Sequence, residues 1–341
     1  MNPAIWPRGQ PLRERLLVVD PRRRTIHGAH LADLPSVLRP GDVLVVNDAA
    51  TLPASLRARG PDGEVVEIRL IAAEGNGVWT ALLLGSGSWK RRTEDRPSPP
   101  RYAPGTVLQL DGMEARVEAS SPVSPRLVKL AFDRSGESFW SALYRAGRPI
   151  QYSYLAGPLR LWHVQSTYAS RPWAVEQPSA GRPLNGELLL ALLSRGIELA
   201  SVTHATGISS TGDPELDALL PLPERFEIPP ETVERIALAR GRGGRVIAVG
   251  TSAARALEGN AAQNGGTLGA GAGITELKIG PDTQLRVAEG ILTGFHERSG
   301  THFSLLQAFA PRELLDAAYA HAEAEGYLNH EFGDSTLIVP E

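Results

Sequence analysis

Short apolar runs between turn residues predict several buried strands in this chain. Residues 15–20 (RLLVVD) form one such run, and residues 42–47 (DVLVVN) form a second one directly after Pro40 and Gly41. Apolar runs of this length with flanking turn residues are typical of strands that are covered on both faces. The two runs therefore predict two strands that can belong to one sheet.

Between Leu56 and about Leu130 the pattern changes to an alternation of apolar and polar residues. Short runs show it, namely EVVEIRLIA, VWTALLL, TVLQL, ARVEAS and RLVKLAF, and Gly, Pro and charged turns separate them. This spacing is typical of an antiparallel sheet or a small barrel. We therefore expect an all-β insertion in this part of the chain.

One segment inside this insertion, residues 88–102 (SWKRRTEDRPSPPRY), is polar, rich in Pro and without periodicity, which predicts an exposed loop. It carries Lys90, Arg91 and Arg92 beside Trp89. These cations could contact RNA phosphates while the indole contacts a base. The alternative is a solvated hairpin tip.

After Ser138 the pattern becomes an alternation of helices and strands. Asn185 can cap a helix at residues 187–195, Gly196 supplies its stop, and residues 197–202 follow as a strand. Further along the chain, the predicted elements are helices at residues 231–240, 252–258 and 312–325 and strands at residues 246–249 and 335–339. Repeated helix-strand units predict a mixed or parallel sheet with helices on its faces.

Length and pattern together indicate the domain organisation. A chain of 341 residues exceeds a typical single domain. We expect a multi-domain α/β (α+β) protein in which residues 1–55 and 150–341 form a discontinuous main domain, with a mixed sheet and flanking helices. Residues 56–149 are expected to form an inserted, barrel-like all-β domain.

Composition narrows the chemistry. The chain has no Cys, which excludes disulfides, thiolate nucleophiles and Cys-ligated metal sites. Its formal net charge of -3 is not that of a general nucleic-acid binder, although a local patch can still hold phosphate. Residues 1–13 lack an apolar signal region, and no apolar run reaches the ~20 residues that span a bilayer. We expect a cytoplasmic protein without a membrane segment, and a monomer.

Polar residues gather where predicted strands end. The run VIAVGTSAAR (residues 246–255) places Gly250, Thr251 and Ser252 between a strand and a helix. Free backbone N–H groups and the helix dipole favour an anion at such a point, and the two hydroxyls add donors. The alternative is a plain helix N-cap.

Two irregular segments are further candidates. The loop at residues 203–212 (THATGISSTG) follows a strand and contains His204, which could be a general base, a ligand-orienting donor or a structural hydrogen-bonding group. Residues 164–183 hold aromatic side chains, an acid and two Arg, as an active-site or substrate-gating loop would. A surface linker is the alternative for this longer segment.

The stretch at residues 291–302 (ILTGFHERSGTH) brings charged and imidazole groups together. His296, Glu297, Arg298 and His302 stand within a few loop residues, and burying them is costly unless they serve a site or each other. The two His do not have the i, i+4 spacing of a helical zinc pair, so we expect no metal. An exposed polar turn is the alternative.

Taken in order, these stretches resemble the S-adenosylmethionine:tRNA ribosyltransferase-isomerase family of queuosine biosynthesis. The matching motifs are RPGDVLVVND with LPASL, VIAVGTSAARALE, ILTGFH with LLQAFA, and GYLNHEFGDSTLI. Their order is what makes the likeness specific, and it spans residues 15–339. The resemblance implies the same fold, with an all-β insertion.

The resemblance also implies a reaction in which S-adenosylmethionine donates its ribose and no metal takes part. A base removes a proton from the ribose 5′ carbon, adenine leaves, and the aminomethyl group of a 7-deazaguanine in the tRNA anticodon attacks the sugar. Methionine is then expelled and an epoxycyclopentane forms. This chemistry needs a base, donors for adenine and an anion site for the methionine carboxylate.

The family pattern, applied position by position, implies the site residues. The expected catalytic residues are His296, Glu224 and His204. The expected donor-binding residues are Gly250, Thr251, Ser252, Arg255, Asn47, Gly207 and Ser179. Other residues that match the family are Pro53, Glu67, Glu258, Phe295, Thr301, Phe332, Gly333 and Asp334.

The chain departs from the family pattern in several polar loops. The family's PTAGLHF is PSAGRPL here, which adds Arg182 and removes an imidazole. His204 is moved by one residue, which after a strand normally turns the side chain to the other face. We therefore interpret the chain as a diverged member with a polar pocket. It either keeps the tRNA reaction, or uses S-adenosylmethionine or a related nucleoside on a small acceptor, or is a non-catalytic binding paralogue.

Overall fold

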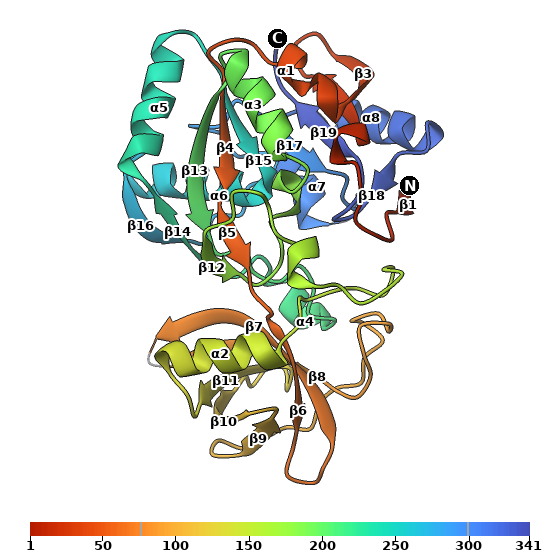
Figure 1. Ribbon diagram of the computed structural model, residues 1–341, viewed down its shortest axis with the longest axis vertical. Helices are drawn as coiled ribbons and strands as arrows, with labels where there is room; N and C mark the ends of the chain where they lie inside the picture. The colour runs from red at the N-terminus through yellow and green to blue at the C-terminus, as the bar shows by residue number, and fades with distance from the viewer. Residues whose placement is uncertain (76, 299) are drawn as a thin grey trace.

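The computed structural model describes residues 1–75, 77–298 and 300–341. It contains a mixed sheet of nine strands with helices on both faces, and a closed barrel of six strands that lies below the sheet in Figure 1. These are the mixed sheet with flanking helices and the all-β barrel that the sequence predicts. The predicted fold class is therefore confirmed.

The main sheet has the strand order β16-β14-β13-β4-β15-β17-β19-β2-β3. The bounds of these strands are Gly271–Thr275 (β16), Glu224–Ile228 (β14), Glu198–His204 (β13), Val43–Asn47 (β4), Val246–Val249 (β15), Gly290–Gly294 (β17), Ser335–Ile338 (β19), Arg15–Asp20 (β2) and Thr25–His30 (β3). The strands β13, β4, β15 and β17 are parallel neighbours, and β14 runs antiparallel to β13. The carboxyl ends of four strands and the start of β14 therefore meet at one edge.

Eight α-helices are described. Their bounds are Leu34–Val37 (α1), Gly136–Ala146 (α2), Gly186–Ser194 (α3), Pro214–Asp217 (α4), Pro230–Gly241 (α5), Gly250–Gln263 (α6), Thr301–Leu306 (α7) and Arg312–Ala324 (α8). Short 3-10 turns lie at Pro11–Arg13 (η1), Leu31–Asp33 (η2), Leu161–His163 (η3) and Ser179–Gly181 (η4). Two small strand pairs complete the main domain, β1 (Asn2–Pro3) with β18 (Leu328–Asn329), and β5 (Ala49–Thr51) with β12 (Arg171–Ala174).

Strand alternation divides the core of the main domain into two layers. In β4, Val43 and Val45 pack with α5, α6, α7 and α8, whereas Leu44 and Val46 pack with α1 and α3. Successive strand residues point to opposite faces, so a run of apolar residues is what a sheet covered on both faces requires. Figure 1 shows α3 in front of the sheet, and α5 beside its edge.

The predicted helix after Asn185 illustrates how local signals specify an element. The Asn185 side chain accepts a hydrogen bond from Leu188 N at 2.9 Å, and Gly196 ends the helix with a φ of 76°. An N-cap oxygen and a left-handed glycine satisfy the free groups at the two helix ends. The observed α3 and β13 agree with the predicted helix and strand to within about two residues.

The barrel has the strand order β10-β11-β8-β7-β6-β9. The bounds of its strands are Met113–Ser120 (β10), Leu127–Phe132 (β11), Val78–Leu84 (β8), Val65–Gly75 (β7), Ser55–Arg59 (β6) and Val107–Leu110 (β9). Helix α2 packs on it, and Phe139 of this helix stacks on Trp79 with ring centroids 5.8 Å apart. Alternating strand residues fill the interior, as the sequence pattern predicts.

The loop that follows β13 joins the two bodies. Its Ile208 and the Leu216 side chain of α4 belong to the apolar core of the barrel. Arg126 of the barrel donates a hydrogen bond to Thr211 O at 2.7 Å, and Ser124 donates one to Asp213 at 2.6 Å. The far half of the polar loop that we expected to hold a ligand therefore serves to dock the barrel.

The chain crosses between the two bodies at Ser55 and Arg148. Their backbones exchange two hydrogen bonds of 2.9 Å, so the crossing strands lie side by side. The domain boundaries at residues 55/56 and 149/150 stay a prediction. The position of the crossing, at Ser55 and Arg148, supports it.

Residues 88–102 have neither helix nor strand, as expected, but they are not exposed throughout. Thr93, Arg96 and Tyr102 are buried. Arg96 pairs with Glu67 at 2.6 Å and donates a hydrogen bond to Gly85 O at 2.6 Å. These two contacts hold the second half of the loop against the barrel. The prediction of an exposed loop is therefore wrong for these residues, while residues 90–92 are exposed.

Candidate active site

Side chains from distant parts of the sequence meet at the carboxyl edge of the main sheet. Asn47 ends β4, His204 ends β13, and Glu224 begins the antiparallel β14, while Ser252 and Arg255 lie in the first turns of α6. We call these five residues the strand-end cluster. All five are buried and all five were predicted as site residues. Ligands of open α/β sheets bind at this edge, because strand ends and helix starts converge there.

Asn47 joins three of these elements. Its side-chain N–H group donates to His204 O at 3.0 Å and to Ser252 Oγ at 3.2 Å. Its side-chain oxygen accepts hydrogen bonds from His204 N at 2.9 Å and Ala49 N at 3.1 Å. A buried amide that uses both its donors and its acceptor holds the strand ends in register. Asn47 therefore positions His204 and Ser252.

Glu224 is a buried carboxylate with two partners. One oxygen pairs with Arg255 Nη1, and the other accepts a hydrogen bond from Gly207 N at 2.6 Å. Burial raises the pKa of Glu224 to about 7, although the positive charge of Arg255 acts to lower it. A carboxylate with this pKa exchanges a proton readily near neutral pH.

His204 faces this pair as a neutral imidazole. Its side chain is buried, and burial together with the charge of Arg255 lowers its pKa to about 3. The His204 Nε2 atom lies 3.3 Å from Glu224 Oε2, but neither ring nitrogen has a partner in hydrogen-bond geometry among the described residues. Arg255 Nη2 also has no such partner. Because buried polar atoms are normally paired, these unpaired atoms fit a polar ligand.

The start of α6 offers the expected anion site. Gly250 adopts a φ of 87°, and no side chain caps the first turn of the helix. The first N–H groups of a helix have no partner within it, so they can bind an anion. The turn η4 covers this corner, because a Cβ on Gly250 would lie 3.2 Å from the Cβ of Ala180. The predicted Ser179 begins that turn.

Three imidazoles form a second group, His296, His302 and His330, which we call the imidazole cluster. The rings of His296 and His302 have centroids 4.4 Å apart. Burial holds the pKa of His296 well below its ordinary value, and it lowers that of His302 to about 4 with a contribution from Arg255. The charge of Arg255 contributes to lowering the pKa of both His204 and His302.

Aromatic side chains connect the imidazole cluster to the barrel. The ring of Tyr154 stacks on His330 with centroids 4.3 Å apart, and Tyr152 stacks on Tyr154 at 6.3 Å. The Tyr152 hydroxyl bonds to Glu176, whose pKa is raised by burial, and Arg69 of the barrel lies over the Tyr152 ring. We did not predict the two Tyr or His330 as site residues. His330 stands in the matching motif GYLNHEFGDSTLI, which could have indicated it, and the two Tyr belong to a segment without periodicity.

Other residues that match the family serve the framework. Both oxygens of Glu258 accept backbone hydrogen bonds from Arg286, Val287 and Ala288. Asp334 pairs with Arg8 at 2.8 Å and with Arg15 at 3.3 Å. The remaining residues are placed as follows: Glu67 pairs with two barrel Arg, Phe295 and Phe332 are in apolar cores, Pro53 adjoins Gly147, and Thr301 is exposed at the start of α7.

Arg182, the charge that the family pattern lacks, is neutralised within the protein. It donates to Glu14 at 2.8 Å, and both side chains are largely buried. Its guanidinium also lies 5.1 Å from the centroid of the Phe332 ring. Burial raises the pKa of Glu14 to about 7, with Arg182 opposing that shift. The substitution therefore adds an ion pair beside the site rather than a free charge within it.

A small cleft adjoins His330 of the imidazole cluster and contains no residue of the strand-end cluster. Ser179, Ala180, Gly294, His330 and Glu331 are among the residues that line a cleft of about 10 Å³. A cleft of this volume holds about one water molecule. This cleft by itself is therefore too small for a nucleoside.

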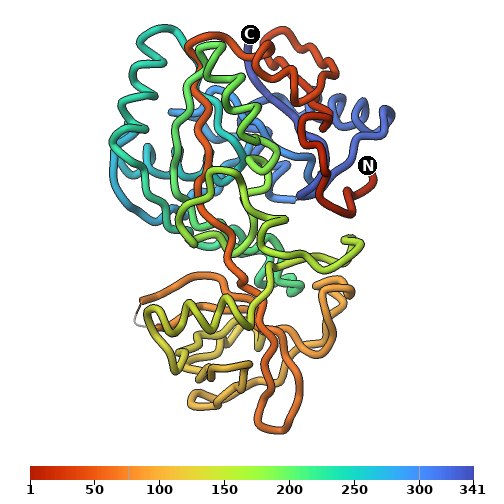
Figure 2. The backbone as a smooth tube through the Cα atoms, viewed as in Figure 1, coloured from red at the N-terminus to blue at the C-terminus, as the bar shows by residue number. Residues whose placement is uncertain are grey.

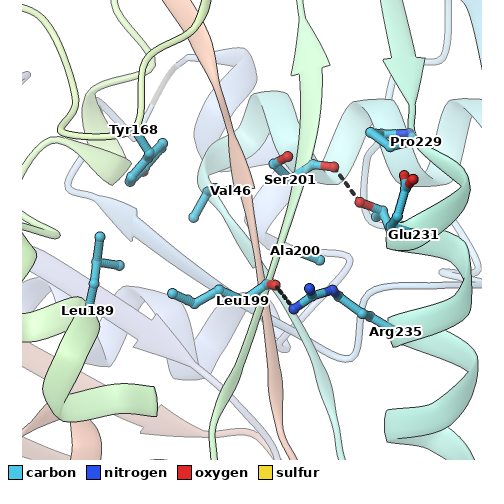
Figure 3. Close-up of a pocket in the computed structure, with 10 residues that line it drawn as sticks. Val46, Tyr168, Leu189, Leu199, Ala200, Ser201, Pro229, Glu231 and Arg235 are labelled. Carbon is cyan, nitrogen blue, oxygen red and sulfur yellow. Dashed lines mark hydrogen bonds between the residues drawn. The ribbon is translucent and has the colours of Figure 1, made fainter.

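A larger groove of about 390 Å³ lies elsewhere, along β13 between α3 and α5. Figure 3 shows Arg235 of α5 directed at Leu199 O, to which it donates a hydrogen bond. The carbonyl oxygen of Ser201 accepts a second hydrogen bond from α5, donated by the Thr232 hydroxyl. None of its lining residues belongs to the strand-end or imidazole clusters. We favour the sheet edge as the reactive site, because the titratable groups with perturbed pKa values are there.

No group of three or more His, Asp or Glu side chains in residues 1–75, 77–298 and 300–341 is arranged to hold a metal ion. Within the same residues, no helix has the length and apolar character that crossing a membrane requires.

Comparison with known proteins gives consistent matches. A family model described as queuosine biosynthesis protein matches residues 4–338. Similar proteins named S-adenosylmethionine:tRNA ribosyltransferase-isomerase include one from Acidithiobacillus ferrooxidans, which is 38% identical over 96% of this chain and 91% of its own length. One from Gloeobacter violaceus is 37% identical over 96% of this chain and 89% of its own length.

A solved structure also resembles this chain. It is an S-adenosylmethionine tRNA ribosyltransferase from Thermotoga maritima, which is 24% identical and has a TM-score of 0.53. The match covers 99% of this chain and 96% of that one. It shows a common fold for the whole chain.

Proposed function

Because the chain belongs to the queuosine biosynthesis protein family, we propose that it catalyses the reaction for which its relatives are named. It is an S-adenosylmethionine-dependent transferase and isomerase that acts on tRNA. We propose 7-aminomethyl-7-deazaguanine as the acceptor base and epoxyqueuosine as the product. The observation that carries the proposal is the convergence of Glu224, His204 and Arg255 beside the free start of α6.

Glu224 is the proposed base. The reaction needs a group that removes a proton from the carbon beside the sulfonium, and a carboxylate with a pKa of about 7 is available in its basic form at neutral pH. Arg255 and Gly207 N fix its two oxygens. His204, with a pKa of about 3, is neutral and is the weaker base of the pair.

The remaining residues have proposed binding roles. The N–H groups at Gly250, Thr251 and Ser252 bind the methionine carboxylate, since a helix start favours an anion. His296 and His302 are neutral at pH 7 because burial lowers their pKa values. His296 Nε2 lies 3.1 Å from Thr293 Oγ1, so its Nδ1 atom is left for the departing adenine, whereas His302 can both donate and accept a hydrogen bond. Ser179 begins the turn η4, which covers the start of α6, so it is proposed to contact the donor there.

We favour the tRNA reaction over the small-acceptor alternative because of how the added Arg182 is bound in this chain. Arg182 is paired with Glu14, so the change adds no unpaired side chain beside the site. A cytoplasmic location and a monomeric state remain our proposals and agree with a reaction on tRNA.

Product analysis tests the proposed function. The purified protein is incubated with S-adenosylmethionine and tRNA that carries the aminomethyl-deazaguanine. We expect adenine and methionine to be released in equal amounts, and only in the presence of that tRNA. Donor binding in calorimetry without any response to tRNA would support a small acceptor instead. If the Glu224→Ala, Thr251→Ala and His296→Ala variants left every detectable activity and the donor affinity unchanged, a non-catalytic protein would be supported.

A further inference from the structure

Three aromatic rings stand in a row on the surface near the imidazole cluster. Trp162 is 73% exposed and Trp6 is 40% exposed. The ring of His163 lies between them, with centroids 5.5 Å from Trp162 and 5.0 Å from Trp6. We call these three residues the aromatic ledge. Large exposed apolar side chains that gather at one place mark interaction sites.

The ledge is held firmly. Ala156 N donates to Ile5 O at 2.9 Å, which ties the N-terminal segment to the segment that carries Trp162. Arg160 N donates to His163 Nδ1 at 3.0 Å. Residues close to the ledge in sequence, Ala4, Leu159 and Val164, pack in one small apolar core with Leu155, Phe332 and the partly buried Trp89. A rigid aromatic surface loses little entropy when a partner binds.

Positive charge surrounds the ledge. Lys90 and Arg91 are exposed beside Trp89, and Arg160 is exposed just before η3. None of these three forms an ion pair with any residue that the structure describes, whereas Arg92 pairs with Glu94 at 3.5 Å. Figure 2 shows the N-terminal segment in red, residues 150–165 in yellow-green and the loop around Lys90 in orange on the same side of the molecule. The patch is thus cationic in a protein of net charge -3.

The ledge adjoins the candidate active site. Tyr154 packs on the same small core and stacks on His330, and His330 N donates a hydrogen bond at 3.2 Å to O of Phe295, the neighbour of His296. A ligand that lies on the ledge and continues past Tyr154 therefore reaches the imidazole cluster. A polymeric substrate in which one unit reacts needs such a binding surface next to the reactive site.

We propose that the aromatic ledge, with Lys90, Arg91 and Arg160, binds the single-stranded anticodon loop of the tRNA, and that an unpaired base beside the reacting one stacks on Trp162. The proposal rests on the proposed function, which supplies tRNA as the acceptor. Unpaired bases stack on aromatic side chains while cations hold the phosphates, and this pairing of groups is what the ledge offers. An acidic peptide would match the cations but would leave the flat indole faces unused.

Binding of a fluorescently labelled anticodon stem-loop RNA tests the ledge directly. Loss of one base–aromatic stack weakens binding by about tenfold to a hundredfold, so we expect that effect for Trp162→Ala and a smaller one for Trp162→Phe. Arg91→Ala should weaken binding and reduce its dependence on salt. Leu190→Ala and Arg242→Ala, which change equally exposed residues of α3 and of the end of α5, serve as matched controls.

The outcomes separate the ledge from the reaction. Wild-type affinity for the RNA in Trp162→Ala, with adenine release intact, would overturn the ledge and leave the proposed function standing. Weaker RNA binding in Trp162→Ala, with no adenine release by the unaltered protein, would support the ledge and overturn the proposed reaction. Failure of the unaltered protein to bind the RNA would overturn both.

Discussion

The carboxylate of Glu224 and the guanidinium of Arg255 form an ion pair that is buried at the carboxyl edge of the main sheet. Burial raises the pKa of Glu224 to about 7 even though the charge of Arg255 opposes the shift. One guanidinium nitrogen of Arg255 has no partner among the described residues. The pair thus combines a base that is active near neutral pH with a free donor for a ligand.

Glu224→Gln removes the proposed base and keeps the shape of the side chain. We expect kcat to fall by about 10²- to 10⁴-fold, the range for loss of a general base. In the unaltered enzyme kcat/KM should rise as the pH approaches about 7 and level off above it, because the carboxylate is basic only above its pKa. Adenine release measured from pH 5.5 to 9 checks both. Glu234→Gln, on the exposed face of α5, is the control, and a Glu224→Gln enzyme within tenfold of wild type would exclude this role.

Glu331 should make stability depend on pH. Its Oε2 atom is buried without a partner among the described residues, and burial raises its pKa from 4.5 to about 7. The folded state then holds the proton more tightly than the unfolded state, so this group's contribution is fully present below about pH 4.5 and is lost as the pH rises through about 7.

Glu331→Gln removes that dependence. At pH 8 we expect the free energy of unfolding to increase by on the order of 2 kcal/mol, and at pH 4 we expect almost no change. Urea denaturation at the two pH values measures the difference. A change of the same size at both would show that ionisation of Glu331 is not the cause.

Glu258 should matter for stability more than for chemistry. Its carboxylate accepts three backbone hydrogen bonds, from Arg286, Val287 and Ala288, at 2.7 to 2.9 Å. Glu258→Ala leaves these buried donors unpaired, which should lower the free energy of unfolding by about 3 kcal/mol. Chemical denaturation checks this value. Glu118→Ala, at an exposed position of β10, should change it by less than about 0.5 kcal/mol.

Gly250 combines a left-handed backbone with a close contact. Its φ is 87°, and an added Cβ would lie 3.2 Å from Ala180. Gly266 has a φ of 92° and nothing within 4 Å of such a Cβ, so it isolates the backbone effect. We expect Gly266→Ala to destabilise the protein by about 1 kcal/mol. Gly250→Ala should cost more and should also weaken S-adenosylmethionine binding in calorimetry; equal effects of the two variants would exclude a special role for the corner.

Much of the fold follows from local signals in the sequence. The Asn185 cap and the Gly196 stop delimit α3, and the apolar run at residues 246–249 is the buried strand β15. Alternating residues between positions 56 and 130 form the barrel strands. Periodicity and caps act over a few residues, so they can be recognised without knowledge of the rest of the chain.

The sequence by itself also indicated the residues of the strand-end cluster: the strand and helix pattern indicated His204 and Ser252, and the family resemblance implied Asn47, Glu224 and Arg255. Only the tertiary structure decided what these residues do to one another. The pKa of Glu224 depends on burial by elements that are distant in sequence, and the sheet order alone brings His204 beside it. Likewise, the stack of Tyr154 on His330 and the pairing of Arg182 with Glu14 join segments more than 160 residues apart. Interactions of this kind depend on which elements pack together, and local pattern contains no information about that.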